Sequence, residues 1–352
     1  MKLTFRWYGE SDPITLEQIR QIPRMSGIVS AVYDVKPGEV WSEESIQKLK
    51  DRANENGLEF EVVESVPVPE EIKYGGPNAP KLIENYCENI RRLGRAGVKC
   101  VCYNFMPVFD WLRSELEHIH EDGANSLAYD DATLLTMNPA EGGLSLPGWD
   151  ESYTVSELKD LLALYENVSE EDLWNNLSVF LKAVIPVAEE AGVNMAIHPD
   201  DPPWGLFGLP RIITCEKNYD RFLKIVDSRA NGLTFCTGSL GASSDNDLVY
   251  LASKYADRIH FLHLRNIKIT SERQFYEVGH PTECGSLDMF GIVNALVENG
   301  FDGYVRPDHG RMIWGEKGRY GYGLYDRALG ATYIVGLFEG IEKSRANNRK
   351  DR

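Results

Sequence analysis

VNMAIH at residues 193–198 is the first of four short apolar segments that decide the fold; GLTFC (232–236), IHFLHL (259–264) and GYVRP (303–307) follow it. Their branched and aromatic residues favour extended structure, and continuous apolar runs are typical of parallel strands covered on both faces. Segments with apolar residues at helical spacing separate them, and glycine usually ends each one. The second half of the chain therefore predicts alternating strands and helices.

The first half of the chain repeats this alternation. Four further strands are predicted at Leu3–Trp7, Gly27–Val32, Leu58–Val63 and Val98–Asn104. Between them, Ser42 is a suitable cap for the start of one helix. Eight strands that alternate with helices indicate an α/β fold, a (β/α)8 TIM barrel. A doubly wound sheet is the alternative, but no Gly-x-Gly-x-x-Gly follows a strand.

One connection is far longer than the others. Strands four and five are separated by about 90 residues, where a β-α-β unit needs about 30. Val108, Leu112, Leu116 and Ile119 stand at helical spacing, and a second helical stripe spans 158–165. We therefore expect a long helical insertion after strand 4, over about 105–168, that acts as a lid or a subunit contact.

The expected organisation is one barrel domain, residues 1–342, followed by a polar tail, residues 343–352. The net charge of −17 argues against nucleic-acid binding. No apolar run approaches the ~20 residues that a membrane span needs, and no signal peptide is recognisable. The six cysteines match no disulfide framework, so we expect reduced thiols in a cytoplasmic protein, with Cys100 and Cys102 in the core.

Barrel enzymes place their sites at the carboxyl ends of the strands. The last four strands end at or near His198, Cys236, His263 and Asp308. Each residue alone has an ordinary structural interpretation, but together they predict a metal site. Imidazole and thiolate ligands favour a transition metal, and the carboxylate keeps Mn²⁺ and Fe²⁺ among the candidates.

Further polar residues lie near the same ends. His309 adjoins Asp308 and is expected to face the substrate, and a tyrosine held between glycines in the loop 318–325 can exchange a proton. His260 should point to the opposite side of its strand from His263 and have a structural role. Candidate substrate-binding residues are the arginines, whose forks suit a carboxylate, and a turn histidine: Arg6, Arg265, Arg306, Arg311 and His280.

Several of these motifs resemble those of D-mannonate dehydratases. The specific match is AIHPDDPP at 196–203, and the Asp308-His309-Gly310 and Gly321-Tyr322-Gly323 segments also fit. The resemblance implies a xylose-isomerase-like barrel and a hydro-lyase that converts D-mannonate to 2-dehydro-3-deoxy-D-gluconate in hexuronate (glucuronate) breakdown. It implies Mn²⁺ or Fe²⁺ on the same four ligands, with His309 and Tyr322 as the proton-transfer pair.

Three other functions compete with this one. A metal-dependent sugar isomerase or epimerase would use a similar site without eliminating water. An apurinic endonuclease should carry more histidines and a basic face, and a closed structural zinc would need no substrate. Among partners we expect a small sugar acid and a second copy of the chain, in a homodimer or higher homo-oligomer.

Overall fold

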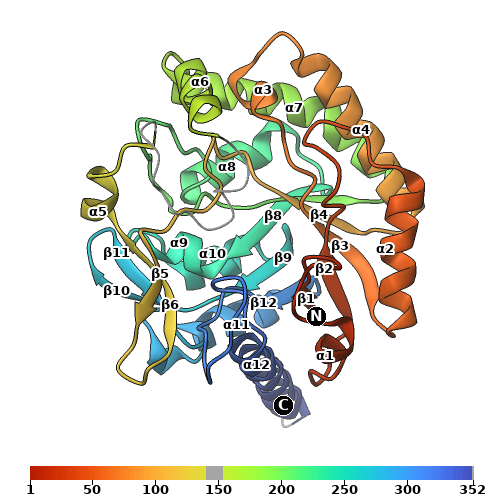
Figure 1. The fold of residues 1–352 in the computed structure, drawn as a ribbon. Coiled ribbons are helices and arrows are strands. Elements are labelled where there is room, and N and C mark those ends of the chain that lie inside the picture. The colour runs from red at the N-terminus through yellow and green to blue at the C-terminus, as the bar shows by residue number, and fades with distance from the viewer. Residues whose placement is uncertain (140–153, 351–352) are drawn as a thin grey trace.

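The computed structural model describes residues 1–139 and 154–350. Its centre is a closed barrel of eight parallel strands in the order β1-β12-β9-β8-β7-β4-β3-β2 (Figure 1). Each of the eight predicted runs contains or overlaps one of these strands, so the predicted barrel is confirmed. The strands are β1 (Lys2–Arg6), β2 (Gly27–Ser30), β3 (Glu59–Glu64), β4 (Cys100–Tyr103), β7 (Asn194–Ile197), β8 (Asn231–Cys236), β9 (Ile259–Leu264) and β12 (Tyr304–Pro307).

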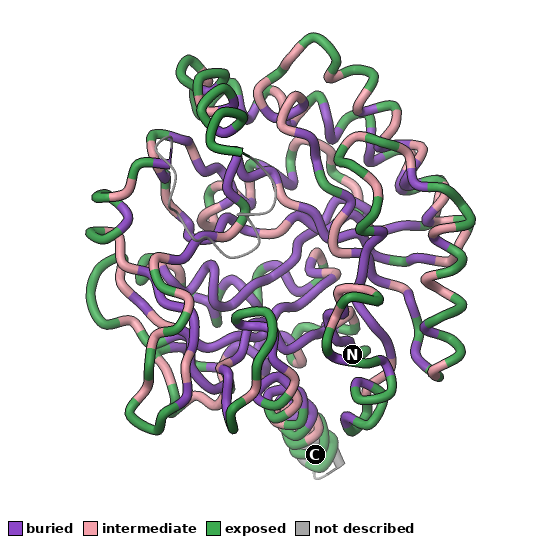
Figure 2. The backbone as a smooth tube through the Cα atoms, in the orientation of Figure 1, coloured by how far each residue is buried: buried purple, intermediate pink, exposed green. Residues whose placement is uncertain are grey.

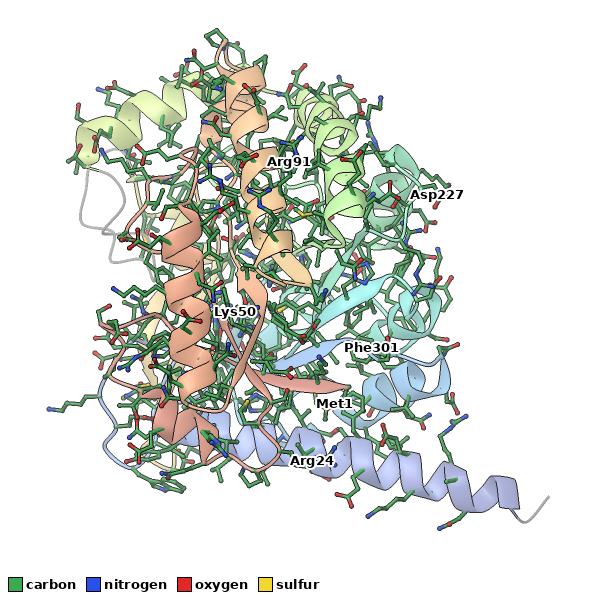
Figure 3. The ribbon with its side chains drawn as sticks, turned by 90° about the vertical axis from the view of Figure 1, so that its right-hand side faces the viewer. Met1, Arg24, Lys50, Arg91, Asp227 and Phe301 are labelled. Carbon is green, nitrogen blue, oxygen red and sulfur yellow. The ribbon has the colours of Figure 1, made fainter. Side chains whose placement is uncertain are left out.

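Helices surround the barrel and cover the outer face of its strands. Ser42 caps the start of α2 as predicted, and Ser169 and Asp172 form a capping box at α7. α12 lies along one side of the barrel, and its end extends past the rest of the molecule (Figure 3). It includes most of the segment predicted as a tail. The helices are α1 (Leu16–Arg20), α2 (Glu43–Glu55), α3 (Glu70–Tyr74), α4 (Ala79–Arg95), α7 (Glu170–Ala191), α8 (Glu216–Ile225), α9 (Thr237–Gly241), α10 (Leu248–Tyr255), α11 (Met289–Glu298) and α12 (Tyr325–Lys350).

Burial is concentrated in the strands and in the helix faces that cover them (Figure 2). A large apolar cluster fills the space between barrel and helices, and a smaller one lies apart from it. Cys100 and Cys102 belong to the smaller cluster at 0% and 2% exposure, so their predicted burial in the core is confirmed. The six cysteines, all of them in the described residues, form no disulfide.

The expectation of helix across 108–119 is wrong. Residues Glu115–Ile119 form strand β5, which pairs with β6 (Asn125–Asp130) in an accessory sheet of order β10-β11-β6-β5. β10 (Ile267–Ser271) and β11 (Gln274–Glu277) reach this sheet from a second excursion, after β9. β5 pairs with the strand that follows it, β6, and β6 pairs in turn with β11, which is distant in the sequence. Pairing between strands decides the structure here, and a spacing pattern within one segment does not report such pairing.

The second helical stripe of the insertion is confirmed. It forms α6 (Val155–Tyr165), and a short helix, α5 (Asp131–Leu135), follows β6. The remaining part of the predicted insertion, residues 140–153, lies outside the described residues. Over the ranges that the structure covers, no helix has the length and apolar character needed to cross a membrane.

Candidate active site

A cavity opens among the carboxyl ends of the barrel strands, where the sequence places the site. It is polar, and most of its walls come from β1, β3, β4 and the segments after β7 and β12. Three predicted site residues that directly follow barrel strands line it: His198 after β7, and Asp308 and His309 after β12. Aromatic rings of Tyr8 and Trp111 line it as well.

The four predicted metal ligands lie together beside this cavity. Ligand atoms of His198, Cys236 and His263 all lie within 4.8 Å of one another. The Oδ2 atom of Asp308 is 3.4 Å from the Cys236 sulfur. Four neighbouring parallel strands deliver these side chains, because the barrel brings their carboxyl ends to one rim.

A hydrogen bond orients His198, and the charged neighbours of His263 orient its ring, so that one nitrogen of each imidazole faces the other. His198 donates from Nδ1 to the carbonyl of Pro199 at 2.6 Å, which leaves a lone pair on Nε2. In His263, Nε2 faces Glu64 at 3.5 Å, while Nδ1 lies 3.3 Å from an Arg306 nitrogen, a donor. The two facing nitrogens are 3.2 Å apart. Together with a thiol and a carboxylate, this donor set fits a transition metal.

The carboxylates around this cluster stay ionised. Burial alone would raise the pKa of Asp308, but the charge of Arg306, 2.6 Å away, outweighs burial and holds it well below its usual range. The pKa of Glu64 is well below its usual range for the same reason, since Arg306 also contacts that carboxylate at 3.0 Å. Because metal ligands bind deprotonated, an ionised Asp308 is ready to coordinate.

The structure also brings together His309 and Tyr322. Nε2 of His309 lies 3.0 Å from the Tyr322 hydroxyl, and the Trp111 ring packs 4.5 Å from the imidazole. Burial raises the pKa of Tyr322 well above its usual range, so the phenol keeps its proton. Gly321, at φ +75°, supports this contact, since a Cβ there would meet Leu127 at 2.6 Å.

Two of the predicted substrate-binding arginines line the cavity. Arg306 is already bound to Glu64 and Asp308. Arg6 has an ion pair with Glu64 at 3.3 Å, yet within the described residues its Nε and Nη1 atoms have no hydrogen-bond partner, although both are buried. Arg6 is therefore the cavity arginine with donors left for an anion.

The other three substrate-binding candidates do not line the cavity as the described residues form it. Arg265 is fully buried and bound to protein carboxylates, including Asp201 at 2.8 Å. Arg311 pairs with Asp326 at 2.9 Å, and His280 is buried against Gly330 of α12. Their side chains leave the strand ends in other directions, which the sequence pattern could not fix.

Four charged residues near the site were missed by sequence reasoning. Glu64 directly follows the predicted run 58–63, and Asp201 lies within the HPDDPP stretch, so both carried a signal. Arg113 and Glu277 carried none, because they lie in the two excursions that form the accessory sheet or lead into it. Both are fully buried and in contact with each other at 2.9 Å.

Fold and site together define a TIM barrel with a candidate metal centre at its carboxyl end. The barrel resembles that of an L-ribulose 3-epimerase, with a TM-score of 0.57 at 14% identity, over 98% of this chain and 97% of that one. A family model, D-mannonate dehydratase (UxuA), matches residues 1–348. The chain belongs to the D-mannonate dehydratase family, as its motifs predicted, and it is a hydro-lyase.

Close relatives agree with this assignment. A mannonate dehydratase from Oceanobacillus iheyensis is 53% identical over 97% of this chain and 98% of its own length. One from Thermotoga petrophila is 53% identical over 98% and 99%. The crystal structure of mannonate dehydratase from Streptococcus suis serotype 2 superposes with a TM-score of 0.92 at 49% identity, over 98% of this chain and 96% of that one.

Proposed function

We propose that this chain dehydrates D-mannonate to 2-dehydro-3-deoxy-D-gluconate, with Mn²⁺ or Fe²⁺, as a step of hexuronate breakdown. The observation that carries the proposal is that His309 and Tyr322 lie 3.0 Å apart in a cavity that two of the four candidate metal ligands, His198 and Asp308, also line. Dehydration of a sugar acid needs a proton-transfer pair and a metal ion side by side.

The residues that would hold the ion are His198, Cys236, His263 and Asp308. When bound, a divalent ion supplies Lewis-acid stabilisation of the negative charge that develops on the substrate carboxylate. The chain contributes by fixing the ligands: Pro199 and Glu64 orient the two imidazoles, and Arg306 keeps Asp308 ionised.

The elimination moves one proton off C2 and one onto the C3 hydroxyl. One member of the His309–Tyr322 pair takes the C2 proton, and the other protonates the leaving hydroxyl, which departs as water. The C–H electron pair becomes the C2–C3 double bond, and the resulting enol tautomerises to the 2-keto acid. The hydrogen bond of 3.0 Å between the two side chains lets the pair act on neighbouring carbons.

Arg6 binds the anionic end of the substrate. Its guanidinium is buried in the cavity wall, where Nε and Nη1 form no hydrogen bond within the described residues, and it stacks at 4.8 Å over the Tyr8 ring. A forked pair of donors matches the geometry of a carboxylate. This contact selects a sugar acid over a neutral sugar.

We further propose that the chain works in the cytoplasm as one barrel domain, residues 1–342, in a homodimer or higher homo-oligomer. Six reduced thiols suit a reducing compartment. The insertion, about 105–168, exposes the apolar side chains of Ile119, Leu135 and Leu164, which suits a subunit contact. Sedimentation velocity tests the assembly, and a monomer at micromolar concentration would contradict it.

An assay of metal-stripped protein tests the reaction. D-mannonate is added with and without Mn²⁺ or Fe²⁺, and the product is followed by mass and by keto-acid detection. Metal-dependent loss of one water with formation of a 2-keto acid is the expected result. A product of unchanged mass would instead indicate an isomerase or epimerase, and no turnover with metal bound would reject the proposed substrate.

A further inference from the structure

Glu277 reaches the proton-transfer pair from outside the barrel. It is the last residue of β11, and its side chain is fully buried. Its Oε1 atom accepts hydrogen bonds from Arg113 at 2.9 Å and Arg265 at 3.0 Å, and it lies 2.8 Å from Nδ1 of His309. Within the described part of the chain, Oε2 has no hydrogen-bond partner. The side-chain hydrogen bonds of this carboxylate are therefore all made by Oε1, the oxygen that faces His309.

Nδ1 of His309 has a second neighbour, Nη1 of Arg265, at 2.7 Å. Because this ring nitrogen has a single in-plane position, it either donates to Glu277 or accepts from Arg265. Arg265 has other acceptors: its Nη1 atom donates to Oε1 of Glu277 at 3.0 Å, and its Nη2 atom donates to Asp201 at 2.8 Å. A carboxylate oxygen can accept several donors at once, whereas a bare Nδ1 would place two lone pairs 2.8 Å apart in a buried site.

We propose that Glu277 is a positioning residue that accepts the Nδ1 proton of His309 and so fixes the orientation and tautomer of the imidazole. Nε2 then presents its lone pair to the Tyr322 hydroxyl, 3.0 Å away. This inference rests on the proposed role of His309 and Tyr322 in dehydration. Among the residues that the structure describes, Glu277 belongs neither to the cavity lining nor to the candidate metal ligands, and it acts through His309.

The inference gives the accessory sheet a role in the reaction. Glu277 is held by Arg113, which precedes β5, and Arg113 also binds Asp201 through two hydrogen bonds of 2.8 and 3.1 Å. The carbonyl of Glu277 accepts from Ser126 of β6 at 2.7 Å. The sheet thus supplies the buried anion that supports His309, and the ion pairs with Arg113 and Arg265 balance its charge.

The first test compares Glu277→Gln with a control that loses the same ion pair. Arg113→Gln removes the Arg113–Glu277 contact but leaves the Glu277–His309 contact. We expect Glu277→Gln to lower kcat at least about 100-fold, with KM within about threefold of wild type, because a misoriented proton-transfer group affects the chemical step. Arg113→Gln should lower Tm comparably yet lower kcat less than about tenfold.

The double variant Glu277→Gln/Arg113→Gln removes both buried charges and covers the case in which Glu277→Gln alone does not fold. A folded double variant with a kcat still about 100-fold low supports the positioning role. A kcat within about threefold of wild type in either Glu277 variant would overturn it.

A second readout does not depend on turnover. In ¹⁵N-histidine NMR of the full chain, with His309 assigned by comparison with His309→Asn, the wild-type ring should carry its proton on Nδ1. Glu277→Gln should shift His309 towards the Nε2-protonated form, and a wild-type ring protonated on Nε2 would overturn the inference. If wild type does not dehydrate D-mannonate while the Nδ1 tautomer is present, the proposed function fails and the Glu277–His309 contact stands.

Discussion

The two ends of the barrel both gather charged side chains, but they differ in how far water is excluded. At the amino end, Lys2 pairs with Glu59 at 3.4 Å while 47% of its side chain remains exposed. At the carboxyl end, Arg265 and Glu277 pair at 3.0 Å with both side chains at 0% exposure. Exposed pairs contribute little to stability, whereas removal of one partner from a buried pair leaves an uncompensated charge.

Two histidines on β9 show the same difference within one strand. His260, at the amino end, faces away from the site and contacts the carbonyl of Arg229 at 2.6 Å. His263, three residues later, is fully buried beside Cys236 and His198. We therefore expect substitutions at the carboxyl end to change the chemistry and substitutions at the amino end to change stability alone.

The largest effect is expected at a metal ligand. Cys236→Ala should release the ion and lower kcat/KM about 10⁴-fold or more, since metal-ion catalysis supplies several kcal/mol of transition-state stabilisation. Metal content by mass spectrometry, measured alongside turnover, separates loss of the ion from loss of fold. Cys215→Ala, at the start of α8, is the matched control and should retain both. A metal-free Cys236→Ala protein with full activity would contradict the proposed centre.

Tyr322→Phe should have the next largest effect. It removes one hydroxyl and leaves the ring packed against Tyr8 at 5.0 Å, so the fold and the metal content should not change. A lost proton-transfer group lowers kcat about 10²- to 10³-fold. Steady-state kinetics on the metal-loaded protein measure this effect. Wild-type kcat in this variant would remove Tyr322 from the mechanism.

A smaller effect, and a different kind, is expected at Arg6. Arg6→Gln should raise KM for D-mannonate about 10- to 100-fold, because a charge-assisted hydrogen bond contributes about 1.5–3 kcal/mol. The change in kcat should be smaller than the change in KM. Arg91→Gln, at an exposed arginine of α4, is the control and should have wild-type constants. An unchanged KM in Arg6→Gln would show that another group binds the carboxylate.

These differences between the ends also explain what the sequence could predict. The strands and the four candidate ligands were predictable because a parallel barrel fixes where each strand ends, so His198, Cys236, His263 and Asp308 share a rim by topology alone. Their partner Glu64 was one residue beyond a predicted strand. Predicting a site residue from its position at a strand end needs no knowledge of which segments pair outside the barrel.

The support of His309 was not predictable in this way. Arg113 and Glu277 are 164 residues apart in the sequence and meet through an accessory sheet whose strands have no strong apolar alternation. The direction of Arg265 and Arg311 depends on the parity of side chains at strand ends, which a shift of one residue reverses. Long-range pairing and parity are set by the folded structure and not by local pattern.

The smallest effect on activity is expected at the amino end, where His260 controls stability. Burial lowers its pKa to about 4, from 6.5 for an exposed histidine. As pH falls below 6.5, the unfolded chain takes up a proton that the folded chain does not, so this residue lowers stability progressively down to about pH 4. His260→Gln should keep wild-type kcat at pH 7 and flatten this part of the stability profile.

Urea unfolding at pH 7 and pH 4.5 measures the difference, with His118→Gln of the accessory sheet as control. Parallel profiles for His260→Gln and wild type would show that His260 is protonated equally in both states, and a loss of kcat would show that the amino end takes part in the chemistry.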